Sequence, residues 1–494
     1  MPGTCLPRQC RGTYAAAMTQ EQRIRQVDQP RYLRAGRRTR LVAIIFMGAV
    51  VLLAGCHATS EPETKDPPRP PNIVVFLTDD QGWGDLGCYG HPIIQSPHLD
   101  RFAQQGLRLT QCYAASAVCS PSRSAILTGR TPYRNGVFRW IPQDSDIHLR
   151  RSEITIATLL KEQGYATCHV GKWHLNGHFN RPTQPQPSDH GYDWWLATQN
   201  NARPSHKNPV NFVRNGEEVG PLEGYSAILI AEEAIGWLRE HRPADRPFFL
   251  TVWTHEPHDP IESDPQFMDR YTEVDDEGVR QHHGNITQLD EAFGMLMRTL
   301  DELQLAEETL VIYTADNGPE GREIKGRHQG STGGLRGRKR SVYEGGIRVP
   351  GLVRWPGHIE PGSVSDKPVI GSDIFATLCD VVDIPLPADR VIDGASFAPL
   401  FTSDEITRPR PLYWRCRISP EPVKVAMRIG NDKILADPEL TRFELYDIAV
   451  DPQETTDLAQ QRPEKLAELK QRLTELKAEI EAEGPDWWRA PKTE

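Results

Sequence analysis

The chain has 494 residues, enough for a large hydrophobic core and for a smaller domain beside a large one. Its net charge at pH 7 is −10, and because nucleic-acid binding depends on a basic surface, this composition argues against a nucleic-acid-binding protein. None of the nine cysteines forms a Cys-x-x-Cys pair, which argues against zinc ribbons and dense disulfide frameworks.

The first 56 residues have the pattern of an export signal. A basic stretch, 31–40, precedes an apolar run, 41–54, that is too short for an ordinary membrane span but typical of a signal-peptide core. The run ends in Leu53-Ala54-Gly55-Cys56, which resembles the bacterial lipoprotein cleavage box and implies lipidation of Cys56. A plain signal peptide and an uncleaved anchor are the alternatives, and Met18 is a second candidate start.

We therefore expect an exported protein of the bacterial periplasm or cell surface, attached to the membrane by an amino-terminal lipid. Residues 57–71 are polar and Pro-rich, which is typical of a flexible tether.

Short apolar runs rich in β-branched residues predict buried strands at 73–78, 166–170, 247–253 and 309–315. Asp79 and Asp80 follow the first run, and Asp316 and Asn317 follow the last. Ligands gather at the carboxyl ends of strands in open α/β sheets, so the two pairs are expected to meet. Oxygen ligands without thiolate or imidazole favour calcium or magnesium over zinc. The alternative is that the acids are ordinary turn formers.

A second motif is Cys119-Ser120-Pro121-Ser122-Arg123, just before a helix-like run. A helix that starts near Pro121 would offer free N–H groups to an anion beside the thiol and the guanidinium. Taken alone, a lone Cys next to apolar residues is more often part of the packing.

Polar residues also follow the two middle strands. Lys172 and His174 stand two apart in Gly171-Lys172-Trp173-His174, and in an extended segment they would point the same way. His255 and His258 both lie in the run after the third strand, and each occurs as His-x-Pro. Further along, Lys339 lies in a basic, Gly-punctuated run at 335–350. The irregular loop 181–219 is the type of segment that carries specificity.

Helical spacing at 154–163, 228–239, 286–303 and 373–378 alternates with the strands, which is typical of an α/β fold. After residue 411 the pattern changes to short strands at 412–415 and 423–428 and a charged helix at 463–481. We expect a catalytic domain over 72–400 and a carboxy-terminal α+β subdomain over 401–494.

Together these motifs resemble the type I, formylglycine-dependent sulfatases of the alkaline phosphatase superfamily, in particular arylsulfatases and N-acetylgalactosamine-6-sulfatases. Cys-x-Pro-x-Arg followed by Thr128-Gly129-Arg130 is the most specific match. Five segments between residues 72 and 350 match, and the resemblance continues more weakly to about residue 469. It implies a large mixed, mostly parallel sheet sandwiched by helices, with a smaller carboxy-terminal antiparallel-sheet subdomain.

The resemblance also implies an activity, hydrolysis of sulfate esters. A formylglycine-generating enzyme would oxidise Cys119 to formylglycine, whose hydrate is the nucleophile. The metal, calcium rather than magnesium, would be held by Asp79, Asp80, Asp316 and Asn317, with modified Cys119 as a neighbour. Arg123 and His174 would support and deprotonate the hydrate. Lys172, Lys339 and His258 would hold the sulfate and assist the leaving group, with His255 as the alternative to His258.

One departure from the family is Arg340, which stands where the family commonly has Gly after the lysine. The exported location and the aromatic, Arg-containing loops favour a sulfated carbohydrate as substrate. Two other functions stay open: a phosphate or phosphonate monoester hydrolase of the same superfamily, and a non-catalytic surface glycan-binding protein. The complete set of motif residues argues against the second of these.

Overall fold

The computed structural model describes residues 69–321, 330–403 and 405–484, all within one unit that begins at Asp66. The predicted export signal, Cys56 and most of the predicted tether lie outside the described residues. No helix within these described ranges has the length and apolar character needed to cross a membrane.

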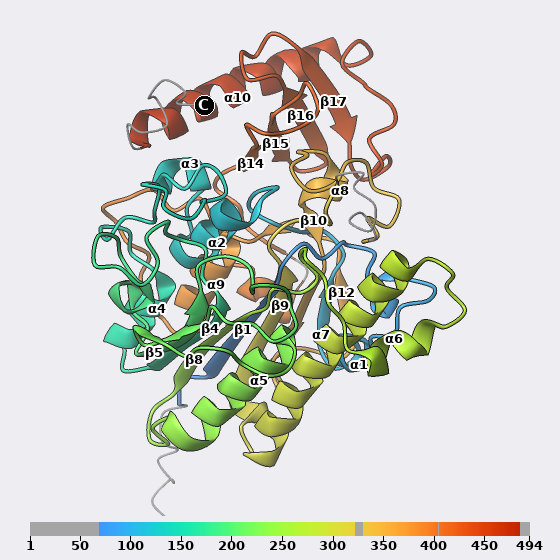
Figure 1. The fold of residues 1–494 in the computed structure, drawn as a ribbon. Helices are drawn as coiled ribbons and strands as arrows, with labels where there is room; N and C mark the ends of the chain where they lie inside the picture. The colour runs from blue at the N-terminus through green and yellow to red at the C-terminus, as the bar shows by residue number, and fades with distance from the viewer. Residues whose placement is uncertain (1–68, 322–329, 404, 485–494) are drawn as a thin grey trace, which may run out of the picture. The chain divides into compact units, whose positions relative to one another are not determined.

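A ten-stranded mixed sheet forms the centre of the fold (Figure 1). Its five central strands run parallel, and antiparallel strands extend it on both sides. In spatial order the strands are β12 (Ser363–Ser365), β2 (Leu107–Leu109), β11 (Gly351–Arg354), β9 (Thr309–Ala315), β1 (Asn72–Thr78), β8 (Phe248–Trp253), β4 (Ala166–Lys172), β5 (Trp194–Thr198), β6 (Val213–Arg214) and β7 (Glu217–Glu218).

Both faces of the sheet are buried, as the continuous apolar strands predict. Successive side chains of a strand point to opposite faces, so Val75 belongs to one core and Val74 to the other. Figure 1 shows α5 and α7 packed together along one face. That face is covered by α1 (Pro97–Gln104), α5 (Ser226–Gly236) and α7 (Glu277–Glu302), and the opposite one by α2 (Cys119–Thr128), α4 (Ile156–Glu162) and α9 (Asp373–Val381).

A separate antiparallel sheet follows near the carboxyl end (red in Figure 1). One of its faces packs on the long helix α10 through Leu473 and Met427, and its other face packs on the segment before α2 through Trp414 and Val118. The elements are β14 (Leu412–Arg415), β15 (Val425–Ile429), β16 (Asp432–Ala436), β17 (Phe443–Asp447) and α10 (Pro463–Glu483).

Short elements connect these layers. A three-stranded sheet is formed by β10 (Arg348–Val349), β3 (Cys112–Tyr113) and β13 (Val369–Ile370), and the short helices are α3 (Pro132–Asn135), α6 (Pro265–Met268) and α8 (Glu344–Ile347).

The predicted fold class is confirmed: a large, mostly parallel sheet between helices, and a small antiparallel sheet. Two predicted boundaries were wrong. Helix α7 begins at Glu277 rather than near residue 286, because the Asp276 carboxylate caps it by accepting from the Val279 N–H. Helix α2 begins at Cys119 itself, two residues before Pro121.

Candidate active site

The two acidic pairs meet at the carboxyl ends of neighbouring strands. Strand β1 pairs in parallel with β9, so Asp79 and Asp80 emerge beside Asp316 and Asn317. The Asp80 N–H donates to Asp316 Oδ1 at 3.3 Å, and Asn317 Nδ2 donates to Asp80 Oδ1 at 2.7 Å. All four side chains are buried. The two pairs therefore lie together, as the sequence predicts.

Helix α2 places Cys119 and Arg123 one turn apart on one face, which points both at the acids. Arg123 Nε donates to Asp316 Oδ2 at 2.9 Å, and Nη2 lies 2.7 Å from the same oxygen. Nη1 donates to the Lys172 carbonyl at 2.9 Å. Cys119 Sγ and carboxylate oxygens of Asp79 and Asp316 all lie within 4.8 Å of one another. The thiol therefore lies among the oxygen ligands.

The environment of Cys119 makes it a weak nucleophile as a free thiol. Burial raises the pKa of the Cys119 thiol, and the lysines 172 and 339, which favour the thiolate, do not offset this. At neutral pH the sulfur keeps its proton.

Two lysines from different parts of the chain each contact one of the first two acids. Lys172 Nζ, at the end of β4, donates to Asp79 Oδ2 at 2.5 Å. Lys339 Nζ donates to both Asp80 oxygens, at 2.5 and 2.7 Å. Burial alone would raise the pKa of Asp79, but Lys172 and the cations around it hold the Asp79 pKa well below its usual value. Burial alone would lower the pKa of Lys339, but Asp80 holds it above the usual value.

The two candidate histidines of the His-x-Pro run have different surroundings. Both ring nitrogens of His255 are used inside the protein, by Ser226 Oγ at 2.6 Å and Thr198 Oγ1 at 2.7 Å. His258 Nε2 instead faces Asp80 Oδ2 at 3.6 Å, and its side chain is 18% exposed. His258 Nδ1 lies 2.6 Å from the Asp259 carbonyl and 3.1 Å from Asn201 Nδ2; it donates to the carbonyl when it carries a proton and accepts from Asn201 when it does not. Only His258 of the two faces the acids.

His174 lies beyond the strand rather than in an extended segment, so the sequence argument for its direction was wrong. Strand β4 ends at Lys172, and His174 has a left-handed backbone with φ 56°. His174 Nε2 donates to the Ile141 carbonyl at 3.0 Å, which leaves Nδ1 unprotonated and without a partner among the described residues. Burial, Lys172 and Arg123 hold the His174 pKa well below its usual value. It is a buried neutral base.

Asn201 is a site residue that the sequence reasoning missed. Its Oδ1 accepts from Lys172 Nζ at 3.3 Å, and its Nδ2 donates to the Asp259 carbonyl at 2.9 Å, the same carbonyl that binds His258. Asn201 thus connects a lysine and a histidine of the predicted site. It lies in an irregular loop without periodicity, so only the run of amides at 199–201 is a sequence signal.

Arg340, the departure from the family pattern, has a left-handed backbone with φ 78°. Glycine adopts this conformation without a steric penalty, which explains the usual glycine there. The Arg340 guanidinium binds both oxygens of Glu320. The backbone N–H of Arg340 donates to the Ala117 carbonyl at 2.8 Å. These contacts compensate for the backbone strain.

The donor set fits a hard divalent cation. Asp79 Oδ1 and Asn317 Oδ1 are buried oxygens without a hydrogen-bond partner in the described part of the chain, and they come from two different strand ends. Burial and the Asp79 charge raise the pKa of Asp316 to about 7 although Arg123 contacts it, so a further cation would favour the ionised form of Asp316. Oxygen-only ligands of this kind suit calcium or magnesium.

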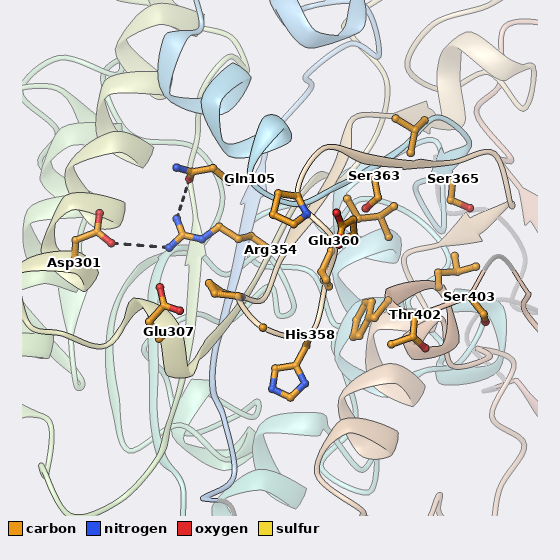
Figure 2. A pocket seen from close by; sticks show the side chains of 18 residues that line it. Gln105, Asp301, Glu307, Arg354, His358, Glu360, Ser363, Ser365, Thr402 and Ser403 are labelled. Carbon is orange, nitrogen blue, oxygen red and sulfur yellow. Dashed lines mark hydrogen bonds and ion pairs between the residues drawn. The ribbon is translucent and has the colours of Figure 1, made fainter. Parts of the chain in front are cut away.

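A cavity of about 860 Å³ lies beside strands β11 and β12, at the other end of the sheet order from β7. Figure 2 shows Arg354 directed toward Gln105 and Asp301, with Nη1 3.3 Å from Gln105 Oε1 and Nη2 3.9 Å from Asp301 Oδ1. Because β11 is antiparallel to β9, Arg354 lies away from the strand ends that carry the acids. None of the predicted site residues is among the described residues that line this cavity, so it is not the active site.

The chain matches the Sulfatase family model over residues 71–384 and the model for the carboxy-terminal region of N-sulphoglucosamine sulphohydrolase over residues 337–479. Arylsulfatase A of Homo sapiens is 36% identical over 463 residues, which cover 84% of this chain and 89% of that protein. N-acetylgalactosamine-6-O-sulfatase of Bacteroides thetaiotaomicron is 30% identical over 515 residues, with 87% and 97% covered.

Among solved structures, Ps i-CgsB in complex with k-i-k-neocarrahexaose has a TM-score of 0.75 at 23% identity, and the match covers 84% of this chain and 94% of that one. This structural similarity shows that the two chains share a fold. From the family match and the identities over most of its length, the chain belongs to the sulfatase family and is a sulfatase, an enzyme that hydrolyses sulfate esters.

Proposed function

We propose that this sulfatase acts on sulfated carbohydrates, with Cys119 converted to formylglycine and a calcium ion held by Asp79, Asp80, Asp316 and Asn317. The observation that carries the proposal is the grouping of Cys119 Sγ with the Asp79 and Asp316 oxygens, which the cations Lys172 and Arg123 contact. A sulfate monoester needs an oxygen nucleophile, neutralisation of its non-bridging oxygens and protonation of its leaving oxygen.

The proposed modification supplies the first of these. The hydrate of formylglycine offers one hydroxyl to attack sulfur and a second whose deprotonation later releases sulfate. A protonated, buried thiol at position 119 offers neither. A formylglycine-generating enzyme is therefore a required partner.

Calcium, when bound, would lower the charge barrier to attack and orient the groups around it. The two unpartnered oxygens, Asp79 Oδ1 and Asn317 Oδ1, support such an ion.

Lys172 and Lys339 lie on either side of the acids and would bind the sulfate oxygens. Arg123 fixes Asp316 and the Lys172 backbone, so it holds the site in register. His174 keeps its proton on Nε2 and would accept the hydrate proton at Nδ1. His258, with Nδ1 held by the Asp259 carbonyl, would in its protonated form donate from Nε2 to the leaving oxygen.

The carbohydrate part of the proposal is supported by relatives. The Bacteroides thetaiotaomicron relative is named for N-acetylgalactosamine 6-O-sulfate chemistry, and the Ps i-CgsB structure holds a neocarrahexaose. Both point to a sulfated sugar.

The first test is mass spectrometry of the tryptic peptide 109–123 from protein made in its native host or together with a formylglycine-generating enzyme. Fragmentation is needed because Cys112 lies in the same peptide. We expect the mass at Cys119 to correspond to an aldehyde, and Cys112 in the same peptide serves as the unmodified control.

A thiol at Cys119 in native protein, together with sulfate release, would contradict the mechanism. A thiol without sulfate release from aryl or carbohydrate sulfates would favour a glycan-binding protein, and faster turnover of aryl phosphate would favour a phosphoesterase.

The second test is the effect of calcium on thermal unfolding. A ligand that binds only the folded state stabilises it, so chelation should lower the Tm and added calcium should restore it. In the variant Asp316→Asn the calcium-dependent shift should shrink. A Tm that does not respond to chelator or calcium would contradict the metal site independently of activity.

We also propose that the protein is exported and anchored by lipid at Cys56, on the sequence pattern alone. Metabolic labelling with a fatty acid should mark the wild-type protein and fail with Cys56→Ser. Equal labelling of both proteins would contradict lipid attachment at Cys56.

A further inference from the structure

A second cavity, of about 360 Å³, lies beside the proposed sulfate site, and its lining is rich in carboxamides. We call it the amide pocket. It is formed by the segments around 177–181 and 199–218, and its amide side chains are Gln143, Asn180, Gln199, Asn200, Asn201 and Asn211.

Two residues that line the amide pocket also contact proposed catalytic residues. Asn201 lines it and binds both Lys172 and the carbonyl that holds His258. Gln199 also lines it, and the Gln199 carbonyl accepts from the His174 N–H at 2.8 Å. A sulfate held by Lys172 would therefore have its ester oxygen and leaving group beside this pocket.

The chemistry of the lining suits a sugar. The carboxamides of Asn201 and Asn211 are already bound within the protein, but Asn200 Oδ1 has no hydrogen-bond partner among the described residues. A carboxamide both donates and accepts, which matches the paired hydroxyl groups of a pyranose ring. Phe179 and Phe212 add apolar walls for the C–H faces of a ring. A volume of this size lies within the usual range for a small-ligand site.

The charge of the lining favours an anionic sugar. Two arginines and one acid, Glu218, line the pocket. Arg181 has a partner, Asp144 Oδ1, at 2.8 Å, but both side chains are more than half exposed, so this pair is weak. The guanidinium of Arg203 has no ion pair among the residues that the structure describes, and Arg203 is exposed. A guanidinium binds a carboxylate or a sulfate through two parallel hydrogen bonds.

We propose that the amide pocket binds the glycan on the leaving-group side of the scissile sulfate, and that Arg203 selects glycans with a further anionic group there. That group is a uronate carboxylate or a second sulfate. This inference rests on the proposed function, because it assumes a sulfated carbohydrate at Lys172 and His258.

The test compares wild type with Arg203→Gln, which removes the charge and keeps a polar side chain. Arg239→Gln is the matched control, because Arg239 is 48% exposed and pairs with Glu302 away from the pocket. Sulfate release is measured for 4-nitrophenyl sulfate, which has no second ionisable group, and for four sugars: N-acetylgalactosamine 6-sulfate, its disaccharide with glucuronate, the methyl ester of that disaccharide, and a disulfated disaccharide.

We expect Arg203→Gln to raise the KM for the anionic disaccharides at least tenfold, with kcat within twofold. Turnover of 4-nitrophenyl sulfate, which offers Arg203 no second anion, and the Tm should change by less than the disaccharide KM. A wild-type KM that rises on methyl esterification identifies the carboxylate as the partner, and one that falls on addition of the second sulfate identifies the sulfate. Arg239→Gln should behave as wild type.

Two outcomes would overturn the inference: equal KM values for wild type and Arg203→Gln on every disaccharide, or an equal loss on the monosaccharide and aryl substrates. Wild-type turnover of the aryl sulfate with none of the sugars, or no sulfate release from any substrate by protein carrying formylglycine, would instead contradict the proposed function.

Discussion

At the scale of single residues, the two histidines of the His-x-Pro run give the sharpest contrast. We expect His258→Ala to lower kcat about 100-fold, the typical contribution of a positioned acid, with little change in Tm. His255→Ala should instead destabilise the fold by about 1–3 kcal/mol, because the buried Ser226 hydroxyl loses its hydrogen bond to the ring and Thr198 keeps only the Asn200 carbonyl. Kinetics and urea unfolding of both variants check this. The reverse pattern would assign the catalytic role to His255.

Arg340 allows backbone strain to be measured apart from its ion pair. Arg340→Gly and Arg340→Ala both lose the pair with Glu320, but only glycine relieves the left-handed backbone. The glycine variant should therefore be more stable than the alanine variant by about 1 kcal/mol. Urea unfolding of the two proteins decides it, and an alanine variant of equal or greater stability would show that φ here carries no strain.

At this scale the sequence could predict which residues gather but not how each is used. The positions of Asp79, Asp80, Asp316 and Asn317 follow from strand ends alone, since parallel strands bring their carboxyl ends to one edge. The choice between His255 and His258 depends on which ring the surrounding loops enclose. Asn201 depends on a loop contact with Lys172 that no local pattern encodes.

At the scale of elements, ion pairs attach α10 to the catalytic helix α2 and the short helix α3. Arg130 follows the end of α2 and Arg134 lies in α3, and both guanidinium groups contact Glu483. The two arginine side chains are 4% and 1% exposed. Glu483→Gln removes a charge that both share, and Glu153 and Asp393 remain as their other partners.

We expect Glu483→Gln to lower the free energy of unfolding by about 1–2 kcal/mol, less than for a fully buried pair because Glu483 is 33% exposed. Glu475→Gln on the same helix is the control: its pair with Arg472 is 3.8 Å long and half exposed, so its effect should stay within about 0.5 kcal/mol. Equal effects of the two substitutions in urea unfolding would show that the attachment of α10 is not electrostatic.

Elements also differ in how well the sequence predicts them. The central strands β1, β8 and β9 are continuous apolar runs buried on both faces, and this pattern is unambiguous. Strands β6 and β7 have two residues each, too few for any periodicity. The first turns of α7 include buried His282, His283 and Asn285, so polar residues occupy the positions where an apolar stripe is expected.

At the scale of the whole molecule, the small sheet supports the loop that carries Lys339. Lys433 on β16 is fully buried and lies 2.9 Å from Glu344 Oε1 and 2.8 Å from Glu454 Oε1. Glu344 begins α8, five residues after Lys339, and its Oε2 accepts from Tyr113 Oη at 2.7 Å. One buried cation thus joins the carboxy-terminal sheet to the loop that carries Lys339, so a change far from Cys119 should affect both stability and activity.

Lys433→Met should lower the free energy of unfolding by about 3–5 kcal/mol, because it takes the cation away from buried Glu454 and leaves Glu344 with only the longer contact to Arg348, at 3.5 Å. It should also lower kcat through the displaced Lys339. Burial already raises the pKa of Glu454 to about 7, and without Lys433 it would rise further, whereas Arg348 and Arg428 would still lower the pKa of Glu344. The folded state then binds a proton at Glu454 more tightly than the unfolded chain does, so the contribution of Glu454 to stability is fully present below about pH 4.5 and is lost as the pH rises.

The deficit of Lys433→Met relative to wild type should therefore be larger at pH 8 than at pH 5. Replacing Glu454 by Gln in the same chain should recover part of it at pH 8, because one of the two buried charges is then gone. Urea unfolding of the single and double variants at both pH values measures this. A deficit that is independent of pH, or a double variant no more stable than the single one, would mean that Lys433 acts through packing rather than through its charge, and the small sheet would then support Lys339 by shape alone.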